Sequence, residues 1–252
     1  MFCPQCGKEI SDGQVFCQFC GSRTAAATEQ GATGRMKTPW EDRERQGFFS
    51  GLASTVKASL FSPAEFFRTM NITGGLSDPL LYAMLTSVTG IMVFYLWQIL
   101  FQQALHNYLP SGGTMTSGIP ALPGAGLAVV GLFMPFLIIV GVFLWSGFLH
   151  LVLLMVRGAA GGFEATFRAV AYSYGAYLFM AIPFCGGLIA SVWSIIVVII
   201  GLKEAHGTSG GKAAFAVLFP LILCCVAVAL LMVVIFGTLA ASFGSLQTAP
   251  WK

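Results

Sequence analysis

Residues 127–156 read LAVVGLFMPFLIIVGVFLWSGFLHLVLLMV, thirty consecutive positions without Lys, Arg, Asp or Glu. A helix satisfies its own backbone hydrogen bonds in hydrocarbon, and about 20 apolar residues are enough for it to cross a bilayer. Charge is also absent over residues 79–126, 169–202 and 213–251. The whole chain is 56% apolar and 9% charged, whereas an average soluble domain has about 25% charged residues. We therefore predict an integral membrane protein.

These uncharged segments predict an all-α polytopic membrane protein with about five transmembrane helices. Asp78 followed by Pro79 is a helix-start signal and begins the first span. Residues 183–187 divide the uncharged stretch 169–202 into two arms, which only just reach across about 30 Å at 1.5 Å per residue. A re-entrant hairpin is therefore an alternative to two crossings. The expected spans are residues 79–105, 127–156, 166–182, 187–202 and 213–241.

Four parts follow one another along the chain. A cysteine module covers residues 1–23, and the small, polar and charged residues 24–46 are typical of a flexible linker. Residues 47–78 form a juxtamembrane segment with two short amphipathic helices, which lie on the bilayer surface or cover the end of the helical bundle. Residues 79–245 form the transmembrane domain. The apolar residues that recur at helical spacing in the first juxtamembrane helix are Phe48, Phe49, Leu52, Val56 and Leu60.

Basic residues in the loops predict the orientation. Twelve fall on one side of the membrane: eight before the first span, and Arg157, Arg168, Lys203 and Lys212 in later connections. The other side has Lys252 alone. Because Lys and Arg are retained on the cytoplasmic side, we expect an inner (cytoplasmic) membrane protein with its N-terminus in the cytoplasm and its C-terminus outside. The polar N-terminus has no signal-peptide pattern and is expected to stay where it is synthesised.

Cys3, Cys6, Cys17 and Cys20 have the spacing C-x2-C-x10-C-x2-C. Each pair is followed by a glycine that lets backbone amides turn toward the sulfurs, and four thiolates close a tetrahedral site. We predict a small zinc ribbon with one structural Zn ion, because a closed four-sulfur site has no open position for substrate water. Two disulfides or an iron site are the alternatives, and a cytoplasmic location disfavours the disulfides.

The membrane domain has few groups that could do chemistry. No carboxylate lies deep in an expected span and no nucleophile is paired with a base, so we predict that the chain is not an enzyme and has no catalytic residues. A candidate intramembrane polar cluster consists of His150, Tyr172, Ser173 and Tyr174. A candidate cytoplasmic interface consists of Arg157, Glu164, Arg168, Lys203, Glu204 and His206. Gly186, Ala190 and Ser194 form a smooth face for close helix contact, within the bundle or with another chain.

A family resemblance is carried by residues 150–179, HLVLLMVRGAAGGFEATFRAVAYSYGAYLF, and 182–220, IPFCGGLIASVWSIIVVIIGLKEAHGTSGGKAAFAVLFP. Together with SLFSPAEFFRTM and GGLSDPLLYAM before the first span, they resemble the Yip family of Rab-interacting integral membrane proteins, in its prokaryotic type. The N-terminal module resembles the zinc ribbons attached to bacterial membrane proteins. The resemblance implies a five-span domain with a cytoplasmic N-terminus. Eukaryotic relatives act in vesicle traffic and bind prenylated GTPases, but the Asp-Leu-Tyr-Gly-Pro type motif of some of them is absent here.

These observations predict an integral membrane adaptor or scaffold of the Yip type, with a role in membrane organisation or trafficking. We expect it to contact the lipid bilayer and, through the ribbon, a protein partner on the cytoplasmic side, and association into a homo-oligomer stays open. The eight positive and eight negative charges before Leu80 give no electrostatic support for nucleic-acid binding. The alternative function is a transporter or channel for an uncharged or amphiphilic solute, with His150, Tyr172, Ser173 and Tyr174 lining its path.

Overall fold

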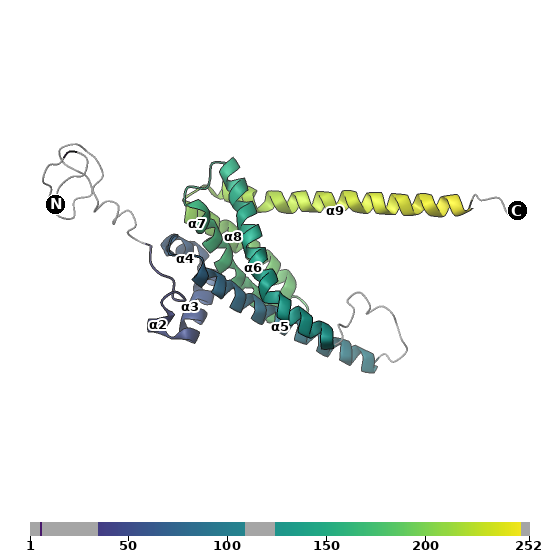
Figure 1. Ribbon diagram of the computed structural model, residues 1–252, viewed down its shortest axis with the longest axis horizontal. Coiled ribbons are helices and arrows are strands. Elements are labelled where there is room, and N and C mark those ends of the chain that lie inside the picture. The colour runs from purple at the N-terminus through teal and green to yellow at the C-terminus, as the bar shows by residue number, and fades with distance from the viewer. Residues whose placement is uncertain (1–5, 7–34, 109–123, 248–252) are drawn as a thin grey trace.

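The computed structural model describes Cys6, residues 35–108 and residues 124–247, and all of its regular elements in these ranges are helical (Figure 1). Four of these helices are long and apolar enough to cross a bilayer, over Ser77–Ala104, Gly131–Met155, Gly186–His206 and Gly210–Thr238. The elements in chain order are α2 (Arg43–Gln46), α3 (Phe48–Phe61), α4 (Pro63–Thr69), α5 (Ser77–Tyr108), α6 (Gly124–Met155), α7 (Gly162–Ser173), the 3₁₀-helix η2 (Tyr174–Ala181), α8 (Gly186–His206) and α9 (Gly210–Gln247).

The segment predicted as the third span is built from two kinds of helix. The α-helix α7 ends at Ser173, and η2 continues it to Ala181. With rises of 1.5 and 2.0 Å per residue, the two together are about 34 Å long. This length matches the hydrocarbon core, although α7 alone is too short to cross it. The crossing of residues 166–182 remains a prediction.

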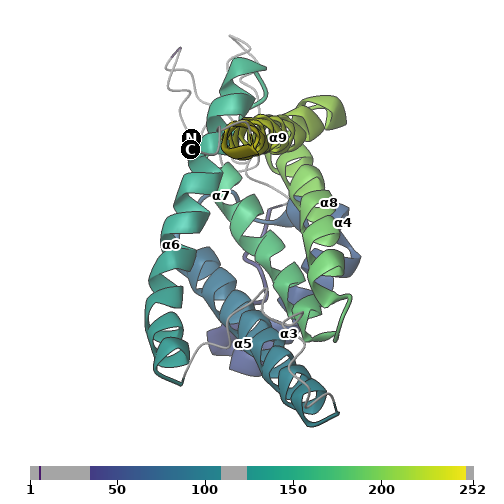
Figure 2. The same cartoon turned by 90° about the vertical axis from the view of Figure 1, so that its right-hand side faces the viewer.

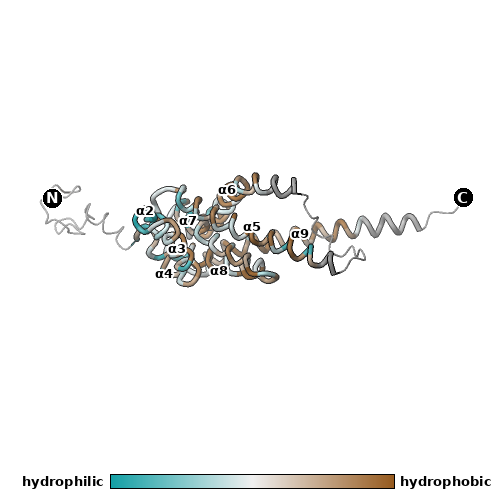
Figure 3. The backbone as a smooth tube through the Cα atoms, turned by 90° about the horizontal axis from the view of Figure 1, so that it is seen from below, coloured by the Kyte–Doolittle hydropathy of each residue, from teal (hydrophilic) through white to brown (hydrophobic). Residues whose placement is uncertain are grey.

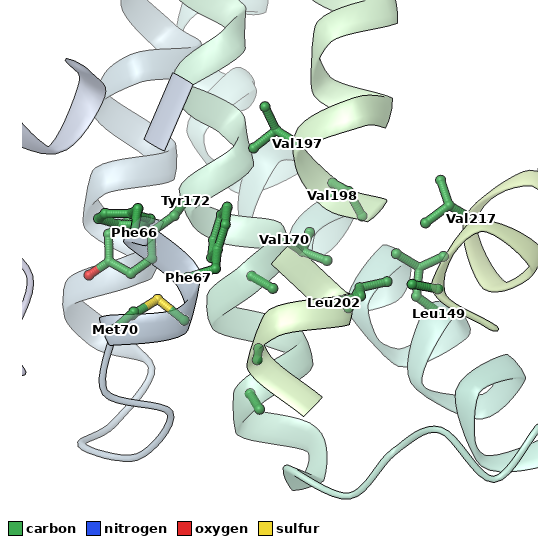
Figure 4. Close-up of a cluster of buried hydrophobic side chains, with 14 of the residues drawn as sticks. Phe66, Phe67, Met70, Leu149, Val170, Tyr172, Val197, Val198, Leu202 and Val217 are labelled. Carbon is green, nitrogen blue, oxygen red and sulfur yellow. The ribbon is translucent and has the colours of Figure 1, made fainter. Parts of the chain in front are cut away.

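Helix α7 occupies the centre of the fold. In Figure 2 it lies between α6 and α8, and it also packs against α5. Every residue from Ala165 to Ser173 is buried. Figure 4 shows how the core forms around it: Phe66 and Phe67 of α4 approach Tyr172, and Leu202 of α8 lies on the other side. The other helices therefore shield the polar side chains of α7 from lipid.

Residues 35–46, which we call the tether, pack against the helices instead of forming the predicted flexible linker. Trp40 is fully buried and belongs to the main hydrophobic core. Met36 pairs with Met70 in an isolated parallel bridge, with Met36 N donating to Thr69 O at 2.6 Å. The prediction of a linker over residues 24–46 is wrong for this second half, because composition alone does not reveal contacts with distant helices. Residues 24–34 lie outside the described part of the chain.

Helices α3 and α4 occupy the predicted juxtamembrane segment and pack on the bundle. The buried face of α3 consists of small residues, Gly51, Thr55 and Ser59, together with Leu60. Phe48 and Phe49, predicted for the apolar face, are 45% and 81% exposed. In Figure 3 the hydrophilic colour gathers around α2 and α3, whereas α5, α6, α8 and α9 are mainly apolar.

The last helix leaves the bundle. Ala213, Ala216 and Val217 at the start of α9 are buried, but only 6% of its apolar window is buried within the protein. Figure 1 shows the rest of α9 extending away from the other helices. Helices α6 and α8 finish at the same end of the bundle, and α9 begins there. We call it the basic end, because it carries Arg157, Lys203 and Lys212.

Candidate functional site

Arg168 is the most deeply buried charge in the described residues, with a side chain that is 1% exposed. Its Nε donates to the carbonyl oxygen of Asn71 at 2.7 Å, and its Nη1 donates to that of Gly75 at 2.9 Å. Its Nη2 forms an ion pair with Glu41 Oε1. A buried guanidinium requires such compensation, because an unpaired charge in a low-dielectric interior is costly. Arg168 thus joins the tether to the centre of the bundle.

Glu41 accepts hydrogen bonds from three residues, two on α7 and one in the tether. Its Oε1 accepts hydrogen bonds from Arg168 and from the hydroxyl of Tyr172, the latter at 2.8 Å, and its Oε2 accepts from the backbone N–H of Thr38 at 3.2 Å. The hydroxyls of Thr38 and Tyr172 lie 3.0 Å apart. We call Thr38, Glu41, Arg168 and Tyr172 the Arg168 cluster. Charge-assisted hydrogen bonds of this kind are about twice as strong as neutral ones, so the cluster fixes the tether in one position.

Two further residues attach the tether. The indole N–H of Trp40 donates to the carbonyl oxygen of Asp78 at 2.8 Å, and the backbone N–H of Trp40 donates to Thr55 Oγ1 at 2.8 Å. Arg35 donates to the carbonyl oxygens of Glu204 at 3.1 Å and Ala205 at 3.3 Å, at the C-terminal end of α8. A cation is favourable there because the final carbonyls carry partial negative charge. Partial burial lowers the pKa of Arg35, and the opposing effect of the Glu204 carboxylate is smaller. The guanidinium still stays charged.

A second polar chain runs through the bundle near the basic end. Thr166 Oγ1 lies 2.8 Å from His150 Nδ1 and 2.9 Å from His206 Nε2. The backbone N–H of Gly161 donates to His206 Nδ1 at 3.0 Å, so a neutral His206 carries its proton on Nε2 and donates it to Thr166. Thr166 then donates to His150. One hydroxyl of α7 therefore connects imidazoles of α6 and α8.

The predicted intramembrane polar cluster is divided between three places. His150 bonds to Thr166, and Tyr172 belongs to the Arg168 cluster. Ser173 donates to Val170 O at 2.6 Å, and Tyr174 stacks on Tyr177 with ring centroids 5.0 Å apart. Ser173, Tyr174 and Tyr177 line a cavity of about 310 Å³ with residues of α6, α8 and α9; we call it the tyrosine cavity. His150 and Tyr172 are not among its lining residues.

The predicted cytoplasmic interface is also divided. Arg168 and His206 are buried and act inside the fold. Glu164 Oε1 accepts from the backbone N–H of Gly75 at 2.6 Å and lies 3.9 Å from Arg168 Nη1. Lys203 and Glu204 pair with each other at 2.8 Å. Arg157 is exposed and lines a small cavity with Lys212.

An open groove of about 790 Å³ lies between the tether and the α3 and α4 helices. Apolar and charged side chains both line it. The apolar ones include Met36, Phe61, Phe66 and Met70, and the charged ones are Lys37, Asp42, Arg45, Lys57 and Glu65. Mixed linings of this type are common where proteins contact one another.

The predicted zinc ligands lie mostly outside the described residues. Cys3, Cys17 and Cys20 fall in the undescribed part, and Cys6 lies in an exposed turn. The structure therefore does not test the four-cysteine site. The donor set itself fits zinc, because four thiolates with two C-x2-C pairs supply a complete tetrahedral shell.

Sequence reasoning missed Thr38, Trp40, Glu41 and Thr166 as interacting residues. One signal was present: Trp40 is the only large aromatic residue in the polar stretch 24–46, and a tryptophan seldom stays fully solvated. The pairing of Glu41 with Arg168 has no local signal, because 127 positions separate the two residues.

Comparison with known proteins supports this architecture. A family model described as the Yip1 domain matches residues 57–245, and a zinc-ribbon domain matches residues 2–24. Neither a curated protein nor a solved structure matches the chain. The Yip1 match begins in α3 and ends in α9, and it covers the four candidate spans and Arg168. The resemblance seen in the sequence is thereby confirmed, and the chain belongs to the Yip1 family of integral membrane proteins, with a zinc-ribbon domain at its N-terminus.

Proposed function

We propose that this protein is a non-enzymatic membrane adaptor that presents its zinc ribbon to a protein partner at the membrane surface. The observation that carries the proposal is the tether. A ribbon on a flexible linker would sample a large volume, whereas the Arg168 cluster and Trp40 attach residues 38–41 to the core. Ten residues separate the end of the zinc-ribbon match from Arg35 and extend at most about 36 Å. The ribbon therefore works close to the basic end.

The groove beside the tether supports the same proposal. It combines apolar side chains with charges of both signs, and it lies next to the point where the tether joins the bundle. A partner held by the ribbon has this surface within reach. The ribbon and the groove are joined by a short stretch of chain, so a partner bound to the ribbon meets the groove at a high effective concentration. Two contacts that are each weak therefore give stable binding together.

Zinc is the cofactor that this proposal requires. Cys3, Cys6, Cys17 and Cys20 would hold one ion, which supplies the folding free energy that about twenty residues with almost no core cannot provide. The thiolates persist in a reducing compartment. This is consistent with an inner membrane location with the ribbon and the basic end in the cytoplasm, as the distribution of Lys and Arg favours.

The experiment is crosslinking in living cells with a photoreactive residue at Lys8 in the ribbon or at Lys57 in the groove. We expect one shared partner band from both positions. Cys3→Ser/Cys6→Ser should abolish it, and Glu41→Gln should weaken it by releasing the tether. Glu44→Gln is the matched control, because it makes the same change on an exposed side chain three residues away. The adaptor proposal is refuted if the band persists unchanged in Cys3→Ser/Cys6→Ser and in Glu41→Gln. It is also refuted if no band exceeds that of an unrelated membrane protein.

A second candidate function rests on the tyrosine cavity. Its lining joins Ser173, Tyr174 and Tyr177 of the central segment to Ser191 and Ser194 of α8, which suits an uncharged solute with hydroxyl groups. Flux into liposomes of a small polyol such as glycerol tests this candidate. Ser194→Leu, which fills the cavity, should stop the flux, and Ser62→Leu on the exposed juxtamembrane surface is the control. Equal flux in liposomes with and without protein would exclude a glycerol path.

A further inference from the structure

A small polar cavity of about 250 Å³ lies at the basic end, and we call it the basic cavity. The candidate spans Gly131–Met155, Gly186–His206 and Gly210–Thr238 each have one end there. Because hydrocarbon begins where apolar spans begin, the cavity lies at the level of lipid headgroups. Its volume corresponds to about eight water molecules, enough for a phosphate group and the atoms next to it.

The cavity carries positive charge that no carboxylate of its lining neutralises. Arg157 and Lys212 both line it, and its lining contains no Asp or Glu. Among the described residues, neither side chain takes part in an ion pair. The nearby carboxylates are engaged elsewhere: Glu204 pairs with Lys203, and Glu164 accepts from Gly75. An anion entering the cavity therefore meets two cations without a competing acid.

Hydrogen-bond donors remain available beside these charges. The Lys212 ammonium donates to the carbonyl oxygen of Arg157 at 3.2 Å, which leaves two of its three N–H groups. Ser209 Oγ accepts from the backbone N–H of Lys212 at 3.4 Å, so its own hydroxyl proton is available to donate. Thr208 adds a second hydroxyl to the lining. Arginine, lysine and two hydroxyls are a donor set suited to phosphate oxygens.

The backbone holds Arg157 in an unusual conformation. Its φ is 53°, in the left-handed region that glycine normally occupies after a helix, and the backbone N–H of Gly158 closes the end of α6 on Leu153 O at 2.8 Å. Glycine at position 157 would relieve the strain but remove the guanidinium from the cavity. The strained residue and the uncompensated charge thus occur at the same position.

We infer that the basic cavity binds the phosphate group of an anionic phospholipid in the adjoining leaflet. The donor set selects phosphate, the net positive charge selects an anionic headgroup over a zwitterionic one, and the position at the span ends selects a lipid over a solute. A soluble phosphate ion offers the same oxygens, so the test separates these two sources. This site is independent of the ribbon and of its partner.

The test uses the full chain, delipidated in detergent and titrated with phosphatidylglycerol, with bound lipid counted by native mass spectrometry. Each basic residue near an anionic surface contributes about a factor of five, so Arg157→Gln/Lys212→Gln should weaken phosphatidylglycerol binding about thirtyfold. Arg157→Lys/Lys212→Arg keeps the charge and should retain binding. Lys57→Gln/Arg68→Gln removes the same charge from exposed positions of α3 and α4 and should change binding less than threefold.

Three outcomes would overturn the inference. Equal binding of phosphatidylcholine and phosphatidylglycerol would show that the site does not select anionic lipid. Wild-type lipid binding by Arg157→Gln/Lys212→Gln would show that the basic cavity is not the binding site. Inorganic phosphate that displaces the lipid at matching concentration would assign the cavity to a soluble anion. The thermal midpoints of wild type and of the double variant are compared without lipid. Equal midpoints establish that any loss of lipid binding does not come from unfolding.

Discussion

Arg168→Met tests whether the tether depends on its buried ion pair. The substitution leaves Glu41 with a side chain that is 7% exposed and has no cation, and it leaves the carbonyls of Asn71 and Gly75 without their donor. Removing one partner of a buried pair costs about 3–5 kcal/mol. At about 2–4 °C per kcal/mol for a domain of this size, the thermal midpoint should fall by about 6–20 °C.

The assay is thermal unfolding of the purified chain in detergent, combined with limited trypsin digestion. Glu41→Met should cost a similar amount, and Glu41→Met/Arg168→Met should cost at least about 2 kcal/mol less than the sum of the single variants, because no unpaired charge remains. Cleavage after Lys37 should accelerate in each single variant, since the released tether exposes its backbone. Glu44→Met is the matched control, because Glu44 is exposed in the same segment.

Three results would contradict the reasoning. A midpoint within about 2 °C of wild type for Arg168→Met would mean that the buried charge needs no partner. Single-variant costs that add to the double-variant cost within about 0.5 kcal/mol would mean that Glu41 and Arg168 do not interact. Unchanged trypsin cleavage after Lys37 in a destabilised variant would place the loss of stability elsewhere in the fold.

Three more predictions concern other contacts. Thr166→Val should lower stability by about 1–3 kcal/mol, because two imidazoles lose their partner, and Thr166→Ser should not; identical melting curves would contradict the bridge. Gly186→Ala should lower the stability by about 1–3 kcal/mol, because its Cβ would overlap the carbonyl of Phe179. At Gly187 an added Cβ meets no other atom, so Gly187→Ala should be neutral or stabilising. Equal effects of the two substitutions would refute the close packing of Gly186 on Phe179. Cys3→Ser/Cys6→Ser should lose one zinc per chain by elemental analysis while the membrane domain melts unchanged, and retained zinc would exclude this ligand set.

The long helices follow from the lack of charge, and so could be predicted. The expected spans 79–105 and 187–202 correspond to α5, Ser77–Tyr108, and α8, Gly186–His206. The segment 166–182 shows the limit of this argument, because an uncharged run does not tell an α-helix from the 3₁₀-helix that continues α7. Hydropathy reports the environment of a residue and not the hydrogen-bond pattern of its backbone.

The candidate site was harder to predict, for a different physical reason. A lone cation near a span end usually reaches water, so the sequence assigns Arg168 to the cytoplasmic interface. It is buried instead, since Glu41 supplies the opposite charge from a stretch whose composition is that of a linker. Such pairing is decided by the three-dimensional path of the chain, which local patterns do not contain. His206 and His150 likewise meet only because Thr166 lies between them.

The attachment of the tether has a mechanical consequence. In the proposed adaptor, a partner that pulls on the ribbon first loads the contacts of Arg35 and Met36, and the tether carries the remaining load through Glu41 to Arg168 in the middle of α7. A slack connection would absorb the same pull by straightening. Tension applied outside the bilayer is therefore transmitted to the innermost helix of the bundle, and the ion pair sets the force at which that transmission fails.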